Sequence, residues 1–489
     1  MATLPTPAYY SFGPYAKKVP LALHKRNRER LCEHLRELAG VPSGAIVVLK
    51  GGVTMLRHST DHEIYFRQES YMHWLFGVLE PDCWGAVEVD TGNSILFMPD
   101  LPADYAVWMG TIHPPEHFKM KYDVDEVHFT KENHFKIVAE LKKKNASKLL
   151  LLRGINTDSG NPTEPADFNG IDQFELDYDH LFNIISELRV MKTDMELDVM
   201  RYVTQVSCNA HKKVMKAVKP LMTQYQAESI FEHSCFADGA CKLMSYDCIG
   251  ASGAHCATLH YGHAGNPNDK VIQNGDMCLF DMGCEYYCYG SDVTCSFPVN
   301  GHFTDDQKMV YEAVLAASRA VMDNTKEGVC WVDNHRLAER VILIHLKNFG
   351  MLKGDVDDMM RAHMGAIFMP HGLGHFIGID THDVGGYPPG VERPTEPGLE
   401  SLRTARNLKA GMAITIEPGC YFIDMLMDQA LDSQEQSAFI EREVFARFRR
   451  FGGVRIEDDV VVREHDCELL SHSLPRTVSE IQVFMGAKS

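Results

Sequence analysis

Two carboxylates in the second half of the chain constrain its fold most strongly. Asp281 ends the apolar run 277–280, where an unpaired buried charge is costly, and Asp292 shares a strand face with Thr294. A bend at residues 284–290 would bring the two carboxylates together. Because close carboxylates cannot both stay ionised without a cation between them, this pair predicts a cation site.

Two further acids lie in segments where apolar and polar residues alternate. The alternation places Thr415 and Glu417 on one strand face, and Arg455 and Glu457 on another. Any one of these acids, taken singly, could form a salt bridge at a strand end. The similar setting of all four acids favours a shared site.

Three histidines, His371, His375 and His382, lie within the glycine-rich segment 370–383. Glycine permits close backbone approach to a metal or ligand. The segment is not a zincin motif, because Gly372 stands where the catalytic glutamate would follow the first histidine. Three histidines at this spacing favour a metal or ligand site over three separate core side chains.

The four carboxylates and one imidazole together form a ligand set for two divalent ions. The negative charges of the four carboxylates offset the positive charges of two divalent ions. A bridging hydroxide leaves the centre near neutrality. Ligation that is rich in oxygen and lacks thiolate favours Mn²⁺, Co²⁺ or Fe²⁺ over a structural zinc ion.

The chain organisation predicts two domains, 1–187 and 188–489. In the first, short apolar runs at 45–49, 94–98 and 149–152 predict strands, and residues 135–143 predict a helix, so the domain is mixed α/β.

The second domain opens on a capping box, in which Thr193 and Glu196 satisfy the amides of a helix start. Helical spacing of apolar residues continues until Pro220. Long helices followed by strands predict an α+β domain.

Composition excludes several classes of partner. The chain has 67 Asp and Glu against 48 Lys and Arg, for a net charge of −19, which argues against nucleic acid. No apolar run approaches the roughly 18 residues of a membrane span, and residues 1–20 lack a secretory leader pattern. The 14 cysteines contain no CxxC pair and predict reduced thiols in the cytoplasm.

The order of Asp281, Asp292, His375, Glu417 and Glu457, with their flanking segments, resembles the pita-bread metallopeptidases of family M24. This family includes methionine aminopeptidase, aminopeptidase P and prolidase. The resemblance is strongest to eukaryotic prolidases, the Xaa-Pro dipeptidases, in the segments LHYGHAG, NGDMCLFDMG, MPHGLGHFIGIDTHDVGGYP, SLRTAR, IEPG and GGVRIEDDVVV. The segments KTDMELDVMRY and RQESYMHWLFGV extend it over nearly the whole chain.

The resemblance implies a pita-bread catalytic domain that holds two Mn²⁺ per subunit, after a domain that builds a homodimer and helps to close the active site. Asp281 and Asp292 would bridge or chelate both ions, His375 and Glu417 would complete one, and Glu457 would bridge both. His260, His371, His382 and Arg403 would face the substrate, while Tyr246 and Arg455 would support the metal ligands.

The implied reaction is hydrolysis of dipeptides that end in proline or hydroxyproline, for proline recycling from peptide and collagen breakdown. Such a peptide bond has no N–H, which a bridging hydroxide attacking the carbonyl does not need. Glu417 would handle the proton, and His371 or His382 would stabilise the oxyanion. The forked donors of Arg403 suit the free C-terminal carboxylate.

Three positions raise separate questions. Cys284 stands where the family usually has a small glycine, and His255 stands where a polar Asn is expected. Trp108 would either reach the substrate of a neighbouring subunit or pack in a core.

Two other functions remain open from the sequence. Aminopeptidase P removes an N-terminal residue ahead of proline from longer peptides, so comparing di- and tripeptides separates the two activities. A pita-bread protein without activity could serve as a peptide-binding module, but such descendants lose metal ligands, and all five are present here.

Overall fold

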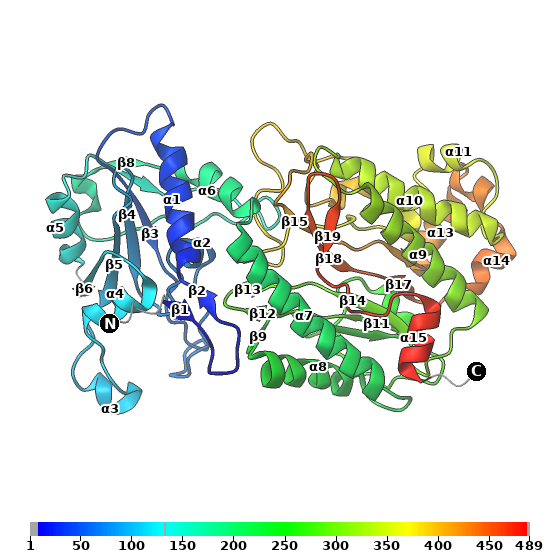
Figure 1. Cartoon of the computed structure of the whole chain (residues 1–489). Helices are drawn as coiled ribbons and strands as arrows, with labels where there is room; N and C mark the ends of the chain where they lie inside the picture. Colours follow the sequence, from blue (N-terminus) through cyan, green and yellow to red (C-terminus); the bar gives the residue numbers. More distant parts are fainter. Residues whose placement is uncertain (1–7, 132–133, 487–489) are drawn as a thin grey trace. The chain divides into compact units, whose positions relative to one another are not determined.

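The computed structural model describes residues 8–131 and 134–486. Residues 1–7, part of the segment 1–20 considered above for a secretory leader, lie outside the described residues. The chain forms two compact units, residues 1–196 and 197–489 (Figure 1). None of the described helices is both long and apolar enough to cross a bilayer.

The first unit is built on a six-stranded mixed sheet in the order β6-β5-β4-β3-β7-β8. Strand β4 pairs antiparallel with β3 and β5, and the outer pairs are parallel. The strands are β3 (Ala45–Lys50), β4 (Trp84–Glu88), β5 (Ser94–Pro99), β6 (Glu126–Thr130), β7 (Lys148–Leu151) and β8 (Glu175–Asp177), with a separate pair β1 (Tyr9–Tyr10) and β2 (Val19–Pro20). The predicted strands and mixed α/β class are confirmed.

Helices cover both faces of this sheet. The predicted helix α5 (Phe135–Lys143) is confirmed, and its Ile137 packs with Ile46 of β3. On the opposite face a Cβ added to Gly85 would lie 2.2 Å from the Phe76 ring, so α2 (Ser70–Phe76) packs directly on β4. The other helices are α1 (Ala22–Arg36), α3 (Tyr105–Met109), α4 (Pro115–Tyr122) and α6 (Leu181–Val190).

The second unit combines small antiparallel sheets with long helices, which confirms the predicted α+β class. Its sheets are β10-β11-β14, β13-β12-β9, β15-β18-β19 and β16-β17. The strands are β9 (Leu243–Met244), β10 (Ile249–Ser252), β11 (Met277–Asp281), β12 (Cys284–Tyr286), β13 (Tyr289–Gly290), β14 (Thr294–Pro298), β15 (Ala413–Ile416), β16 (Gly419–Tyr421), β17 (Gly453–Arg455), β18 (Asp458–Val462) and β19 (Cys467–Leu469).

Figure 1 shows these strands lying among four long helices, α7 to α10. Helices α9 and α10 pack against each other, and α8 contacts β10. The helices are α7 (Asp194–Ala217), α8 (Gln224–Gly239), α9 (Asp305–Asn324), α10 (Trp331–Asn348), α11 (Val356–Arg361), α12 (Gly365–Phe368), α13 (Asp424–Asp432), α14 (Arg442–Arg447) and α15 (Val478–Met485).

The predicted capping box begins helix α7. The Glu196 carboxylate accepts the Thr193 N–H at 2.7 Å, and the Thr193 hydroxyl accepts the Glu196 N–H at 3.3 Å. Glu196 is buried and also accepts the indole N–H of Trp74 at 2.9 Å. These contacts all lie within the first unit, which ends at Glu196.

Replacing Thr193 by alanine should lower the free energy of unfolding by about 1 kcal/mol, since the capping hydroxyl is lost. Denaturant unfolding measures this change. Thr193→Ser keeps the hydroxyl and should stay close to the wild type. Equal losses in both variants would show that the methyl group matters and the cap does not.

Candidate metal and peptide site

A cavity of about 680 Å³ lies within the second unit. The structure brings together there every site residue that the sequence predicts. Its walls include Tyr246, His260, Asp281, Asp292, His371, His375, His382, Arg403, Glu417, Arg455 and Glu457.

Asp281, the last residue of β11, is held at both oxygens. Arg455 donates to its Oδ2 at 2.6 Å, and the Tyr246 hydroxyl donates to its Oδ1 at 2.5 Å. Arg455 also donates to the hydroxyls of Tyr421 at 2.8 Å and Thr294 at 3.1 Å. The carboxylate is therefore fixed in one orientation.

Asp292 lies beside Asp281 because the chain turns between them, as predicted. Strands β12 and β13 pair across this turn, and Asp281 pairs with Thr294 of β14. The turn is tight at Gly283, where an added Cβ would lie 1.9 Å from the Ser291 carbonyl oxygen.

Asp292 is itself positioned through its backbone. Its N–H donates to the Asp459 carboxylate at 3.2 Å, and the Thr204 hydroxyl donates to the same carboxylate at 2.9 Å. Asp292 Oδ1 is buried and has no hydrogen-bond partner among the described residues. An acceptor that is buried in this way calls for a cation or donor that the protein does not supply.

His375 faces two of these carboxylates. Its Nε2 lies 3.3 Å from Asp292 Oδ2 and 3.4 Å from Glu417 Oε1. Its Nδ1 lies 3.0 Å from the Phe376 carbonyl oxygen, which can only accept, so Nδ1 carries the proton. The lone pair of Nε2 is thereby directed at the acidic cluster, as in a metal ligand.

The glycine-rich segment lies against β15. An added Cβ at Gly374 would lie 2.0 Å from the Thr415 carbonyl oxygen, so only glycine allows this approach. The Thr415 hydroxyl accepts the His375 N–H at 3.0 Å and donates to Glu417 Oε1 at 3.2 Å. Thr415 therefore positions both an imidazole and a carboxylate.

Glu457 is 1% exposed and lies between β17 and β18. Its Oε2 accepts the Thr294 hydroxyl at 2.7 Å. Arg476 donates to the carbonyl oxygens of Glu457 at 2.5 Å and Thr294 at 2.7 Å, which fixes the backbone here. One ligand atom each of Asp292, His375 and Glu457 lies within 4.8 Å of the other two.

The buried acids repel one another. Burial raises the pKa of Asp292 and Glu457 well above the usual range, and the neighbouring carboxylates raise both further. Burial likewise raises the pKa of Glu417 to about 7. Divalent cations would remove this repulsion, and the oxygen-rich donor set with one imidazole fits them.

Three further histidines, His260, His371 and His382, line the rest of the cavity. His371 Nδ1 donates to the Gly372 carbonyl at 2.8 Å, and its Nε2 is buried without a hydrogen-bond partner among the described residues. Burial lowers the pKa of His371 to about 3 and that of His382 to about 2. Both rings are therefore neutral at physiological pH.

Arg403 contributes positive charge to the same wall. Burial lowers the pKa of His260, and the charges of Arg455 and Arg403 lower it further. This part of the cavity suits an anionic group, such as a carboxylate.

The structure corrects one expectation about the acids. Only Asp281 lies inside a strand; Asp292, Glu417 and Glu457 lie one or two residues outside. Their backbone N–H groups bond elsewhere, for example that of Glu417 to the Leu373 carbonyl at 2.9 Å, so the strand ladders end before them.

Sequence reasoning assigned no role to the polar side chains that orient the ligands, namely Thr204, Thr294, Thr415, Tyr421, Asp459 and Arg476. Thr294 and Thr415 each stand two residues from a predicted ligand, which is a usable signal. Asp459 and Tyr421 lie close in sequence to Glu457 and Glu417, but they bond Asp292 and Arg455, which are distant in sequence. Thr204 and Arg476 lie outside every predicted motif.

Cys284 and His255 lie outside the cavity lining. The buried Cys284 sulfur lies 3.2 Å from the Ser207 hydroxyl. Strand β12, which begins at Cys284, pairs with β13. The His255 ring stacks on Tyr261 with centroids 5.2 Å apart. In the first unit Trp108 is 84% exposed, so it does not pack in a core.

Residues 198–464 match the model of metallopeptidase family M24, and residues 24–150 match that of the aminopeptidase P N-terminal domain. The chain therefore belongs to metallopeptidase family M24, with the pita-bread catalytic domain after the N-terminal domain. These matches confirm the predicted family and fold.

Individual relatives sharpen this placement. The chain is 57% identical over 486 residues to the Xaa-Pro dipeptidase of Homo sapiens, covering 99% of this chain and 97% of that protein. It is 34% identical over 463 residues to a probable Xaa-Pro aminopeptidase of Verticillium alfalfae, covering 95% and 97%. The structure of Pseudomonas aeruginosa aminopeptidase PepP is similar, with a TM-score of 0.75, 29% identity and coverage of 96% and 98%.

Replacing Thr415 by valine should lower metal affinity by about 10- to 100-fold, as loss of an outer hydrogen bond to metal ligands does. The valine cannot bond either His375 or Glu417. Thr415→Ser retains the hydroxyl and should bind metal like the wild type. Metal titration of the two variants measures the difference, and equal affinities would refute a positioning role.

Proposed function

We propose that this protein is a manganese-dependent Xaa-Pro dipeptidase that releases proline or hydroxyproline from the C-terminus of dipeptides. The observation that carries the proposal is the 57% identity to a human Xaa-Pro dipeptidase along 99% of the chain. The identity to a probable Xaa-Pro aminopeptidase is lower, at 34%. The cavity geometry supports the same activity.

Two Mn²⁺ ions per chain would be held by the four carboxylates and the imidazole, with Co²⁺ or Fe²⁺ as substitutes. When bound, the ions polarise a carbonyl oxygen and lower the pKa of a water molecule. The ligands would be Asp281, Asp292, His375, Glu417 and Glu457.

Glu417 is suited to move the proton during hydrolysis. Burial raises the pKa of the metal-free carboxyl to about 7, and with cations bound beside it the carboxylate would be ionised and able to accept a proton. Thr415 holds one of its oxygens at 3.2 Å. Glu417 would take a proton from the attacking water and pass it to the leaving proline nitrogen.

The neutral histidines would contact the carbonyl oxygen of the substrate. His371 presents an unpartnered Nε2 within the cavity, and the ring centroid of His382 lies 4.4 Å from that of His375. A neutral His382 could donate an N–H to the negative charge that develops on the carbonyl oxygen. His371 could do so only after Nε2 takes up a proton, because Nδ1 carries the proton of the neutral ring. His260, on the same wall, would contact the bound dipeptide.

Restriction to dipeptides requires recognition of the free C-terminal carboxylate. Arg403 lines the cavity, and its planar guanidinium can form two parallel hydrogen bonds to a carboxylate. A longer peptide has an amide in place of that charge. We therefore assign this recognition to Arg403.

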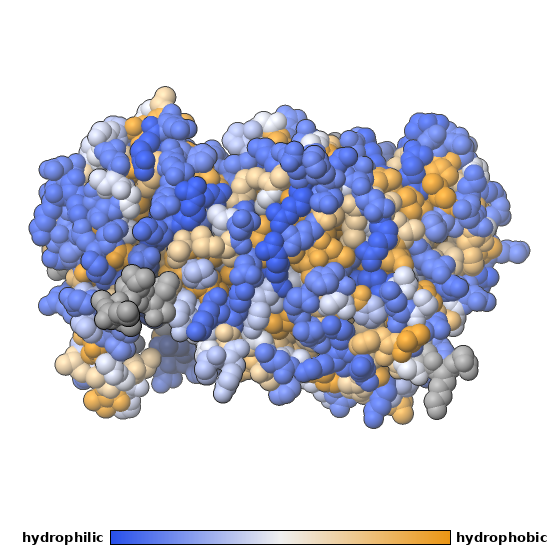
Figure 2. All heavy atoms as spheres, in the orientation of Figure 1, coloured by the Kyte–Doolittle hydropathy of each residue, from blue (hydrophilic) through white to orange (hydrophobic). Residues whose placement is uncertain are grey.

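The first domain, residues 1–187, would build a cytoplasmic homodimer, and residues 188–489 would carry catalysis. In helix α3 the side chains of Val107 and Trp108 are 78% and 84% exposed, an apolar surface that suits a second copy (Figure 2). Measuring the native mass tests the dimer.

The fourteen free cysteines suit a reducing compartment such as the cytoplasm. Activity there would recycle proline from peptide and collagen breakdown.

Removing the metal with a chelator should abolish hydrolysis of Gly-Pro, because the ions activate both water and carbonyl. Adding Mn²⁺ should restore it. The same preparation should cleave Gly-Pro much faster than Gly-Pro-Xaa tripeptides. Full activity after chelation would refute the metal mechanism, and preference for the tripeptide would favour an aminopeptidase P activity.

Replacing Arg403 by alanine should lower kcat/KM for Gly-Pro by about 10- to 150-fold, since a hydrogen bond to a charged group contributes ~1.5–3 kcal/mol. The ratio of Gly-Pro to Gly-Pro-Xaa cleavage should fall with it. Arg403→Lys keeps the positive charge but cannot form two parallel hydrogen bonds, so its kcat/KM should lie between those of the wild type and Arg403→Ala. The exposed Arg336→Ala serves as control, and an unchanged ratio in Arg403→Ala would remove the assignment.

A further inference from the structure

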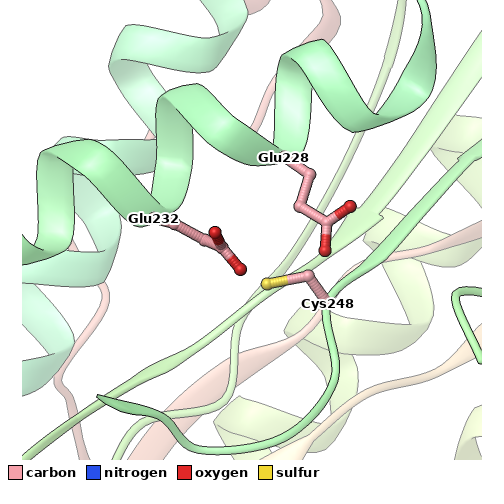
Figure 3. A group of neighbouring side chains, drawn as sticks. All are labelled: Glu228, Glu232 and Cys248. Carbon is pink, nitrogen blue, oxygen red and sulfur yellow. The ribbon is translucent and has the colours of Figure 1, made fainter. Parts of the chain in front are cut away.

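Three ligand-type side chains converge in the second unit outside the cavity lining (Figure 3). Glu228 and Glu232 lie one turn apart on α8, and Cys248 immediately precedes β10. One oxygen of each carboxylate and the Cys248 sulfur all lie within 4.8 Å of one another. Figure 3 shows both carboxylates beside Cys248, whose sulfur points toward Glu232.

The Cys248 thiol is enclosed by the protein. The residue is 3% exposed, and its sulfur makes no hydrogen bond within the part of the chain that the structure describes. Asn268 donates to the Cys248 carbonyl at 2.8 Å and to Glu228 Oε2 at 2.9 Å. Asn268 thereby fixes one carboxylate beside the thiol.

The electrostatics disfavour a reactive thiol. Burial raises the pKa of Cys248 well above its usual range, and the charges of Glu228 and Glu232 raise it further. Burial also raises the pKa of Glu228. A protonated buried thiol is a poor nucleophile and resists oxidation, so these surroundings do not suit redox chemistry. A divalent cation would compensate all three groups at once.

The dimensions fit a small ion. A point between three atoms that are at most 4.8 Å apart lies at most about 2.8 Å from each, and Zn²⁺ needs about 2.0–2.3 Å. The difference requires only small rotations, for which the exposed Glu232 has room. A thiolate ligand favours Zn²⁺ over the Mg²⁺, Ca²⁺ or Mn²⁺ that carboxylates alone would take.

We propose that Glu228, Glu232 and Cys248 form a second metal site that binds Zn²⁺, separate from the cavity ligands. Coordination would release the thiol proton to solvent and leave a fourth position for water. Cys248 adjoins Ile249, which pairs with Asp281, so the ion would brace the strand next to a cavity ligand.

Cadmium titration of the full-length protein, already loaded with Mn²⁺, tests the site. One equivalent of Cd²⁺ should produce a sulfur-to-cadmium charge-transfer band in the ultraviolet, and Zn²⁺ should suppress it by competition. The cavity ligands contain no cysteine, so they cannot give this band. The readout does not depend on peptide hydrolysis.

Cys248→Ser should lose the band, and Glu232→Gln should weaken Cd²⁺ binding by at least about tenfold. Glu232 is exposed, so this variant leaves the fold intact. Cys330→Ser and Cys467→Ser, at the two cysteines that are only partly buried, should keep the band. The proposal would be overturned if the wild type gave no band, or if the band persisted in Cys248→Ser. It would equally be overturned if Glu232→Gln bound Cd²⁺ with unchanged affinity, or if Zn²⁺ failed to compete.

Discussion

Repulsion between carboxylates in a buried cavity is the constraint around which the second unit is organised. Asp281, Asp292 and Glu457 are each at most 8% exposed, and every one of them faces another acid. Burying such charges is costly without compensation. Arg455 compensates Asp281, and the Thr294 hydroxyl bonds Glu457, whereas Asp292 Oδ1 has no hydrogen-bond partner among the described residues. The two proposed cations would offset the charge that the protein leaves uncompensated.

The protein supplies rigidity, and the proposed ions would supply charge. Thr415 couples His375 to Glu417, Asp459 holds the backbone of Asp292, and Arg476 holds that of Glu457. These contacts come from segments far apart in the chain. The ligand geometry therefore depends on the whole unit being folded, which limits the reorganisation needed when metal binds.

Much of the site could be predicted because its residues carry local signals. Carboxylates next to apolar strands, and histidines among glycines, indicate Asp281, Glu417 and His375 from the sequence alone. The capping box at Thr193 likewise indicates the start of α7. By contrast, Asp459 and Arg476 could not be predicted, because they act through backbone groups of residues that are distant in sequence. The strand ends at Asp292 and Glu457 were also missed, since alternation continues in the sequence after the ladder stops.

The metal content of the purified protein tests the account most directly. Wild-type protein saturated with Mn²⁺ and freed of excess metal should retain two ions per chain, whereas Glu457→Gln, which removes a ligand charge proposed to contact both, should retain at most one. Metal analysis by mass spectrometry, combined with circular dichroism to verify folding, provides the comparison. Two ions per chain in the folded variant, or fewer than two in a fully active wild type, would contradict the proposed dinuclear centre.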